Sequence, residues 1–167
     1  MRTLNEMGVL RMSEDSSRDS VSIAALRQAF ERQQRAVRAH PDPSRREREE
    51  HLRALGAMML RNRDRIRKAM SEDFAVHPEL FTDLIEVLGV AGRAEYAISQ
   101  LETWTRDDER AVDPAVFGSG KAFIRYQPKG VVGNIAPWNF PFDLGVGTLV
   151  EMLAAGNRVI LVTTSVS

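Results

Sequence analysis

The sequence predicts an α/β fold in which N-terminal helices are followed by the start of a parallel sheet. First, apolar residues recur at helical spacing as far as Leu101. Second, an apolar strand, a helix and another apolar strand follow one another within about thirty residues, which is a βαβ unit with parallel strands. Third, the sequence stops at Ser167, soon after this unit, and so leaves a sheet edge and a helix face uncovered. We therefore expect an incomplete sheet.

Composition narrows the class of protein. The 167 residues are 43% hydrophobic and 28% charged, which is typical of a globular protein. Basic and acidic residues balance at 23 each, so no net charge favours nucleic acid or an anionic membrane. The first residues carry no apolar run, and no segment approaches the length of a membrane span. We expect a cytoplasmic protein that binds neither nucleic acid nor membranes.

The chain contains no cysteine, which removes disulfides, thiolate metal sites and a cysteine nucleophile from consideration. The other candidate metal ligands, His40, His51 and His77, are far apart and lack the spacing of a ligand set. No metal site is predicted.

The chain divides into three predicted parts. Residues 1–20 are polar and aperiodic, and we expect them to form a flexible leader. Residues 21–112 make up the helical N-terminal part. Residues 113–167 hold a strand hairpin and the first βαβ unit, which we expect to be truncated.

The helical part is interpreted as scaffold. Its predicted buried faces are Ile23, Leu26, Phe30 and Val37, then Leu52, Leu55 and Met59, then Ile66, Met70 and Phe74, and last Leu84, Leu88, Ala91, Ile98 and Leu101. Ser44 and Glu47 fit a capping box that opens the second helix, where Arg48 and its charged neighbours are predicted to be solvated. Glu95 and Glu102 give no sign of catalytic pairing.

Strands and turns follow. The predicted elements are strands at 122–127, 131–136 and 159–162 and a buried helix at 142–155, with Leu144, Leu149, Val150 and Leu153 inward. The run Gly118-Ser119-Gly120-Lys121 is not a phosphate loop, because Ala115 and Ala122 stand where that motif needs a glycine and a hydroxyl residue. The G-x-G-x-x-G fingerprint is also absent, so any dinucleotide must bind in another way.

The most informative string is Gly133-Asn134-Ile135-Ala136-Pro137-Trp138-Asn139-Phe140-Pro141-Phe142. It lies at the carboxyl end of a predicted parallel strand, where ligands of open α/β sheets collect. Pro137 and Pro141 stiffen the loop between them. Trp138 offers a flat surface and Asn139 an amide donor beside a predicted cleft.

Residues 137–141 closely resemble the P-W-N-[FY]-P motif of the aldehyde dehydrogenase superfamily, and residues 154–157 match its A-x-G-N motif. Residues 126–133, which precede the first motif, also resemble the family, and the resemblance extends over roughly 23–160. The sequence of residues 139–144 and the short leader are most similar to the class-3-like, coniferyl-aldehyde dehydrogenase branch.

The resemblance implies NAD(P)+-dependent oxidation of an aldehyde to an acid, with a cysteine nucleophile and a glutamate base. Asn139 matches the asparagine whose amide stabilises the oxyanion, a contribution of about 3–4 kcal/mol to the barrier. Ile135, Ala136, Pro137 and Trp138 match the loop that lines the cofactor site. The full-length family member is expected to be a homo-oligomer, with the hairpin near 123–127 contributing.

Other readings of these residues stay open. Asn139 could cap the following helix, since asparagine favours that position, and Trp138 could serve core packing alone. Residues 162–165 replace the family's lysine-proline-serine-glutamate sequence, so the lysine that contacts the ribose is missing and both NAD and NADP remain candidates. With no cysteine, the chain is expected to be an inactive fragment; the alternative is a non-enzymatic interaction module that binds a partner chain.

Overall fold

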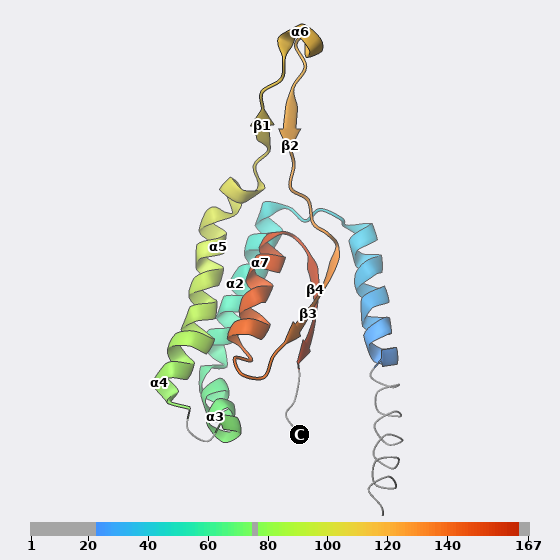
Figure 1. Cartoon of the computed structure of the whole chain (residues 1–167). Helices are drawn as coiled ribbons and strands as arrows, with labels where there is room; N and C mark the ends of the chain where they lie inside the picture. Colours follow the sequence, from blue (N-terminus) through green and yellow to red (C-terminus); the bar gives the residue numbers. More distant parts are fainter. Residues whose placement is uncertain (1–22, 75–76, 164–167) are drawn as a thin grey trace, which may run out of the picture.

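The computed structural model describes residues 23–74 and 77–163, so the predicted leader at 1–20 lies outside the described residues (Figure 1). The helices after the first, which covers 23–39, are α2 (Arg45–Arg61), α3 (Arg63–Phe74), α4 (Glu79–Phe81), the π-helix η1 (Thr82–Gly89), α5 (Val90–Thr105), α6 (Pro114–Phe117), the π-helix η2 (Asp143–Gly147) and α7 (Thr148–Ala154). The strands are β1 (Asp108–Arg110), β2 (Ala122–Ile124), β3 (Val131–Ala136) and β4 (Arg158–Thr163).

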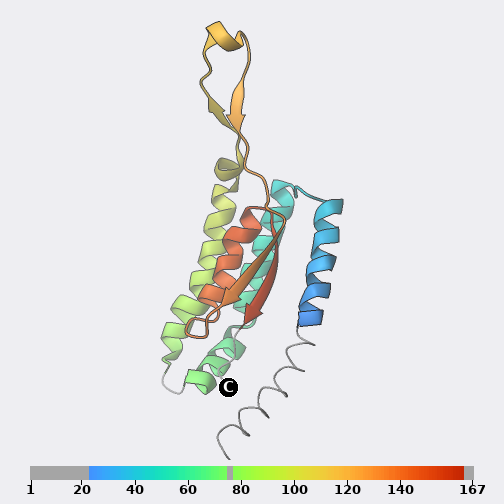
Figure 2. The same ribbon diagram turned by 45° about the vertical axis from the view of Figure 1, so that its right-hand side comes forward.

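The predicted βαβ unit and the α/β class are confirmed. β3 and β4 pair in parallel, from Val131 opposite Arg158 to Ala136 opposite Thr163, and α7 is the crossover helix between them. α7 also packs on α2 and α5, which lie along each other on one side of the sheet (Figures 1 and 2). The core therefore lies between these helices, with Leu52, Met59, Val87, Val90, Leu101 and Val150 fully or almost fully buried.

The start of α2 is as predicted, except for Arg48. Ser44 Oγ accepts a hydrogen bond from the Glu47 amide, and Glu47 accepts one from the Ser44 amide, which completes the capping box. The prediction that Arg48 is solvated is wrong, because it is only 5% exposed. Its guanidinium donates to the carbonyls of Pro43 and Ala154 at 2.9 and 3.1 Å, which ties the start of α2 to the end of α7.

The predicted face of the long helix is wrong in its first half. Leu84 and Leu88 are 55% and 42% exposed, whereas Asp83 and Glu86 are buried. The reason is that residues 82–89 form a π-helix, whose wider turn shifts side chains off the faces expected for α-helical spacing. Arg63 meets the buried Asp83 carboxylate with two hydrogen bonds of 2.7 and 2.6 Å, and this contact lowers the pKa of Asp83.

Two further predictions need correction. Leu144, expected to point inward, is 36% exposed, because it lies in the second π-helix, whereas Val150 on the following α-helical turns is buried. The strand expected at 122–127 is only Ala122–Ile124, and it pairs antiparallel with β1. This hairpin, with α6 at its tip, forms an arm that extends away from the body (Figures 1 and 2).

The predicted first helix is present, but its apolar residues are largely uncovered. Ile23, Leu26 and Phe30 are 58%, 43% and 43% exposed. The helix stands on the side of the β3–β4 pair away from α5 (Figures 1 and 2). None of the helices in residues 23–74 and 77–163 has the length and apolar character that a bilayer crossing requires.

Candidate functional site

The predicted site residues lie together at the carboxyl end of β3, where Ile135 and Ala136 end the strand and Pro137, Trp138 and Asn139 begin the loop that follows. Ile135 and Trp138 are 74% and 55% exposed, and Pro137 and Asn139 are exposed as well. Ala136 differs, because it is only 2% exposed. Its Cβ packs so closely on Gly145 of η2 that a Cβ added to Gly145 would lie 3.2 Å from it. Its side chain therefore packs the loop onto η2 and does not face an incoming ligand.

The upstream side of the loop is fastened to the crossover helix. The side-chain amide of Asn134, on β3, donates to the Gly145 carbonyl at 2.8 Å and to Thr148 Oγ1 at 2.7 Å. With Ala136 packed on Gly145, these contacts fix the point at which the loop begins.

Trp138 is held by a ring contact. Its indole stacks on Phe74 at the end of α3, with centroids 6.1 Å apart and planes 14° from parallel. Phe74 in turn contacts His77, which meets Phe81 edge to face. The indole therefore packs on Phe74, while more than half of the surface of Trp138 stays exposed to solvent. Core packing alone does not explain a tryptophan at this position.

The downstream side of the loop is held by Glu86, which sequence reasoning missed. Its Oε2 accepts hydrogen bonds from the backbone amides of Phe142 and Asp143 at 2.8 and 2.7 Å. Burial raises the pKa of the Glu86 carboxyl, although these two hydrogen bonds act in the opposite direction. The signal available in the sequence was a single charge within the apolar run of residues 84–88, which α-helical phase places on the solvent side.

Asn139 does not cap the following helix. The first two free amides at that end, on Phe142 and Asp143, already bind Glu86. Within the part of the chain that the structure describes, the Asn139 side chain makes no hydrogen bond and is exposed. Its amide is therefore available to a ligand at the carboxyl end of β3.

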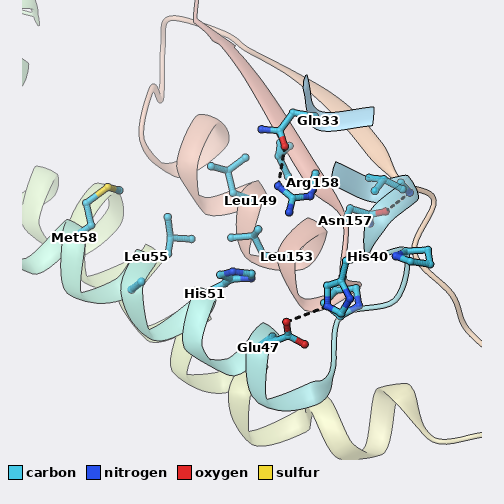
Figure 3. Close-up of a pocket in the computed structure, with 17 residues that line it drawn as sticks. Gln33, His40, Glu47, His51, Leu55, Met58, Leu149, Leu153, Asn157 and Arg158 are labelled. Carbon is cyan, nitrogen blue, oxygen red and sulfur yellow. Dashed lines mark hydrogen bonds and ion pairs between the residues drawn. The ribbon is translucent and has the colours of Figure 1, made fainter. Parts of the chain in front are cut away.

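A groove of about 550 Å³ lies at the opposite end of the strands, where β4 begins (Figure 3). Its lining combines apolar and polar side chains, among them Leu55, Met58, Leu149, Leu153, His40, Glu47 and Arg158. Asn157 closes this end by accepting from the amides of Lys129 and Gly130 at 2.7 and 3.1 Å. The groove is thus separate from the loop that carries Asn139.

No cluster that could hold a metal ion occurs among the described residues.

The chain belongs to the aldehyde dehydrogenase family, whose sequence model matches residues 17–167. It is 33% identical over 140 residues to the probable coniferyl aldehyde dehydrogenase of Caulobacter vibrioides, an alignment that covers 83% of this chain and 29% of that protein. It is 36% identical over 105 residues to the coniferyl aldehyde dehydrogenase of a Pseudomonas species, covering 63% and 21%. The chain therefore spans less than a third of the length of these relatives.

Solved structures show the same fold. Staphylococcus aureus AldH in its substrate-bound state superposes with a TM-score of 0.74 at 24% identity, over 80% of this chain and 29% of that one. The succinic semialdehyde dehydrogenase of Streptococcus pyogenes, in complex with NADP+, gives 0.71 at 22% identity, over 83% and 29%. These likenesses establish the fold.

Proposed function

We propose that this chain supplies one wall of the active site of an NAD(P)+-dependent aldehyde dehydrogenase. In this proposal Ile135, Pro137 and Trp138 line the cofactor, Ala136 packs the end of β3 onto η2 beneath them, and Asn139 is the catalytic residue that stabilises the oxyanion. The observation that carries the proposal is the exposed Asn139 amide, which has no hydrogen-bond partner in residues 23–74 and 77–163 and lies after β3 on a loop held at both ends.

The chemistry follows from what an amide donor can do. When a thiolate attacks an aldehyde, the carbonyl oxygen becomes an anion, and a donor already in position stabilises it without reorganisation. The Asn139 side chain would donate an N–H to that oxygen. The bound dinucleotide would supply the hydride acceptor, and Ile135 and Trp138 offer exposed apolar surface beside it.

On its own, the 167-residue chain is proposed not to oxidise aldehydes. It contains no cysteine, so the thiolate must come from elsewhere, and no lysine occurs after Lys129 to contact a cofactor ribose. Both NAD and NADP stay within the proposal. The aldehyde is proposed to be coniferyl aldehyde or another aromatic aldehyde, which is supported by the names of the two relatives.

We also propose a cytoplasmic protein, divided into a leader at 1–20, a helical part at 21–112 and the sheet part at 113–167, that assembles as a homo-oligomer in its full-length form. The hairpin arm supports assembly, because Phe117, Phe123 and Ile124 are 62%, 51% and 42% exposed on it. The same exposure supports the second candidate function, a non-enzymatic fragment that binds a partner chain.

A chimera tests the catalytic proposal. Residues 23–163 would replace the matching segment of the Pseudomonas coniferyl aldehyde dehydrogenase, and the chimera would be assayed with coniferyl aldehyde and each dinucleotide. We expect Asn139→Ala to lower kcat roughly a hundred- to a thousandfold. The matched control is Asn62→Ala, at the end of α2 and far along the chain from the loop.

Two outcomes would contradict the proposal. An Asn139→Ala chimera with the kcat of its parent would remove the oxyanion role. Formation of NADH or NADPH by the purified 167-residue chain would disprove its inactivity. Binding of a full-length relative by the chain, without any effect of the Asn139 substitution, would favour the interaction fragment.

A further inference from the structure

Glu86 is a fully buried carboxylate on η1, and within the part of the chain that the structure describes both of its hydrogen bonds go to the residues that end the Asn139 loop. We propose that Glu86 is a positioning residue for Asn139: it fixes the downstream end of the loop and thereby sets where the Asn139 amide points. This inference rests on the proposed function of Asn139.

The contact is suited to fixing a backbone. One oxygen, Oε2, accepts from two successive amides, so the chain at Phe142 and Asp143 cannot rotate without breaking both bonds. Pro141 has no amide hydrogen, so these are the first two free donors after the loop. They also lie at the start of the η2–α7 helix, where an anion is favoured by the helix dipole.

The loop is short between its fastened ends. Asn134 and Ala136 hold the upstream end on the crossover helix, and only residues 137–141 separate them from the Glu86 contact. Two of those five residues are prolines, whose φ angles are fixed. The Trp138 stack on Phe74 adds a third point of attachment next to Asn139. Removing Glu86 would release the downstream end and leave Asn139 held only from the upstream side, by the end of β3 and the Trp138 stack.

Simple packing does not account for a carboxylate at this position. Glu86 is 0% exposed, and its Oε1 is buried with no hydrogen-bond partner among the residues that the structure describes. A buried charge with one oxygen unsatisfied is unfavourable, and an apolar side chain of similar size would usually stabilise the core more. The structure gives this carboxylate one specific use, which is to hold the two amides. Asp143 is placed independently by Arg93, whose Nη2 donates to it at 2.9 Å.

NMR on the intact 167-residue chain tests the proposal. In the unmodified chain we expect through-hydrogen-bond couplings from the Phe142 and Asp143 amide nitrogens to the Glu86 carboxyl carbon, and an Asn139 side-chain amide as ordered as the core. Spectra of the unmodified chain without either coupling, or with a freely rotating Asn139 side chain, would overturn the proposal whether or not any variant folds.

The variant is Glu86→Gln, with Glu95→Gln on the exposed side of α5 as the matched control. In Glu86→Gln we expect the Phe142 and Asp143 amides to exchange at least about tenfold faster, and the Asn139 side-chain amide to lose order, while β3 and β4 amides keep their protection. A loss of protection spread evenly over the molecule would assign Glu86 a general structural role, and an unchanged loop would also overturn the proposal. None of these readouts requires Asn139 to take part in catalysis, which the chimera kinetics decide separately.

Discussion

Two asparagines at opposite ends of the β3–β4 pair have opposite environments. Asn157, before β4, accepts from the amides of Lys129 and Gly130 and donates to the Met152 carbonyl at 3.2 Å. Asn139, after β3, makes no hydrogen bond within the described residues. Both lie in segments that resemble motifs of the aldehyde dehydrogenase family, yet among the described residues only the Asn157 side chain is hydrogen-bonded.

The difference shows how the same side chain serves structure at one end and stays available at the other. At the Asn157 end, the asparagine side chain itself holds the backbone of Lys129 and Gly130. At the Asn139 end, the loop is held by Asn134, Trp138 and Glu86, through contacts that do not include a hydrogen bond to Asn139. A polar side chain left free on a firmly held backbone is the arrangement expected for a preorganised donor.

The largest effect on stability is expected from Asn157→Ala. It removes the acceptor for two amides, one of them on the buried Gly130, and should lower the free energy of unfolding by about 2 kcal/mol. Urea unfolding of the variant and the unmodified chain measures this. Asn157→Asp keeps the acceptor and should recover part of the loss; equal losses in both variants would show that the two amides are not what Asn157 stabilises.

A smaller loss is expected from Trp138→Leu. The substitution removes the stack on Phe74 while keeping an apolar side chain, and should cost about 1 kcal/mol. The measurement is again urea unfolding, with Trp104→Leu as the control, since Trp104 lies at the far end of α5 and contacts Tyr96. If Trp138→Leu unfolds at the same urea concentration as the unmodified chain, the stack does not attach the loop.

Acid is expected to destabilise the start of α2, near the Asn157 end of the strands, through Glu47. The effect should be smaller than that of Trp138→Leu, because the capping box is exposed to solvent. Hydrogen bonds from Ser44 lower the pKa of Glu47 from 4.5 to about 2. A lowered pKa means that the contribution to stability is present above pH 4.5 and is lost as the pH falls toward 2. The melting temperature should therefore fall less steeply between pH 5 and pH 2 in Glu47→Gln than in the unmodified chain. An unchanged slope would show that the capping box does not carry this pH dependence.

The smallest effect is expected from Asn139→Ala, which should change the free energy of unfolding by less than about 0.5 kcal/mol. The reason is that the fold uses none of the hydrogen-bonding groups of this amide among the described residues. Urea unfolding beside Asn157→Ala gives the direct comparison. A loss as large as that of Asn157→Ala would mean that Asn139 is a structural residue after all.

Local sequence patterns predicted much of this fold. The capping box at Ser44, the stop before His40 and the parallel strands around α7 all follow from short-range rules, and the structure has each of them. The wrong faces predicted for Leu84, Leu88 and Leu144 lie in the two π-helices. The other errors are the burial of Arg48, the early end of β2 at Ile124 and the uncovered face of the first helix. A π-turn is set by packing between helices and leaves no regular spacing in the sequence.

The sequence by itself determined the family, the α/β class and the loop that carries Asn139, because these depend on a contiguous motif and on periodicity. Only the tertiary structure decided which polar groups are buried and what they hold. Arg48 reaches the end of α7 across 106 positions of the chain, and Glu86 reaches Phe142 across 56. Such contacts depend on how helices turn against one another, so no local pattern around Arg48 or Glu86 reveals them.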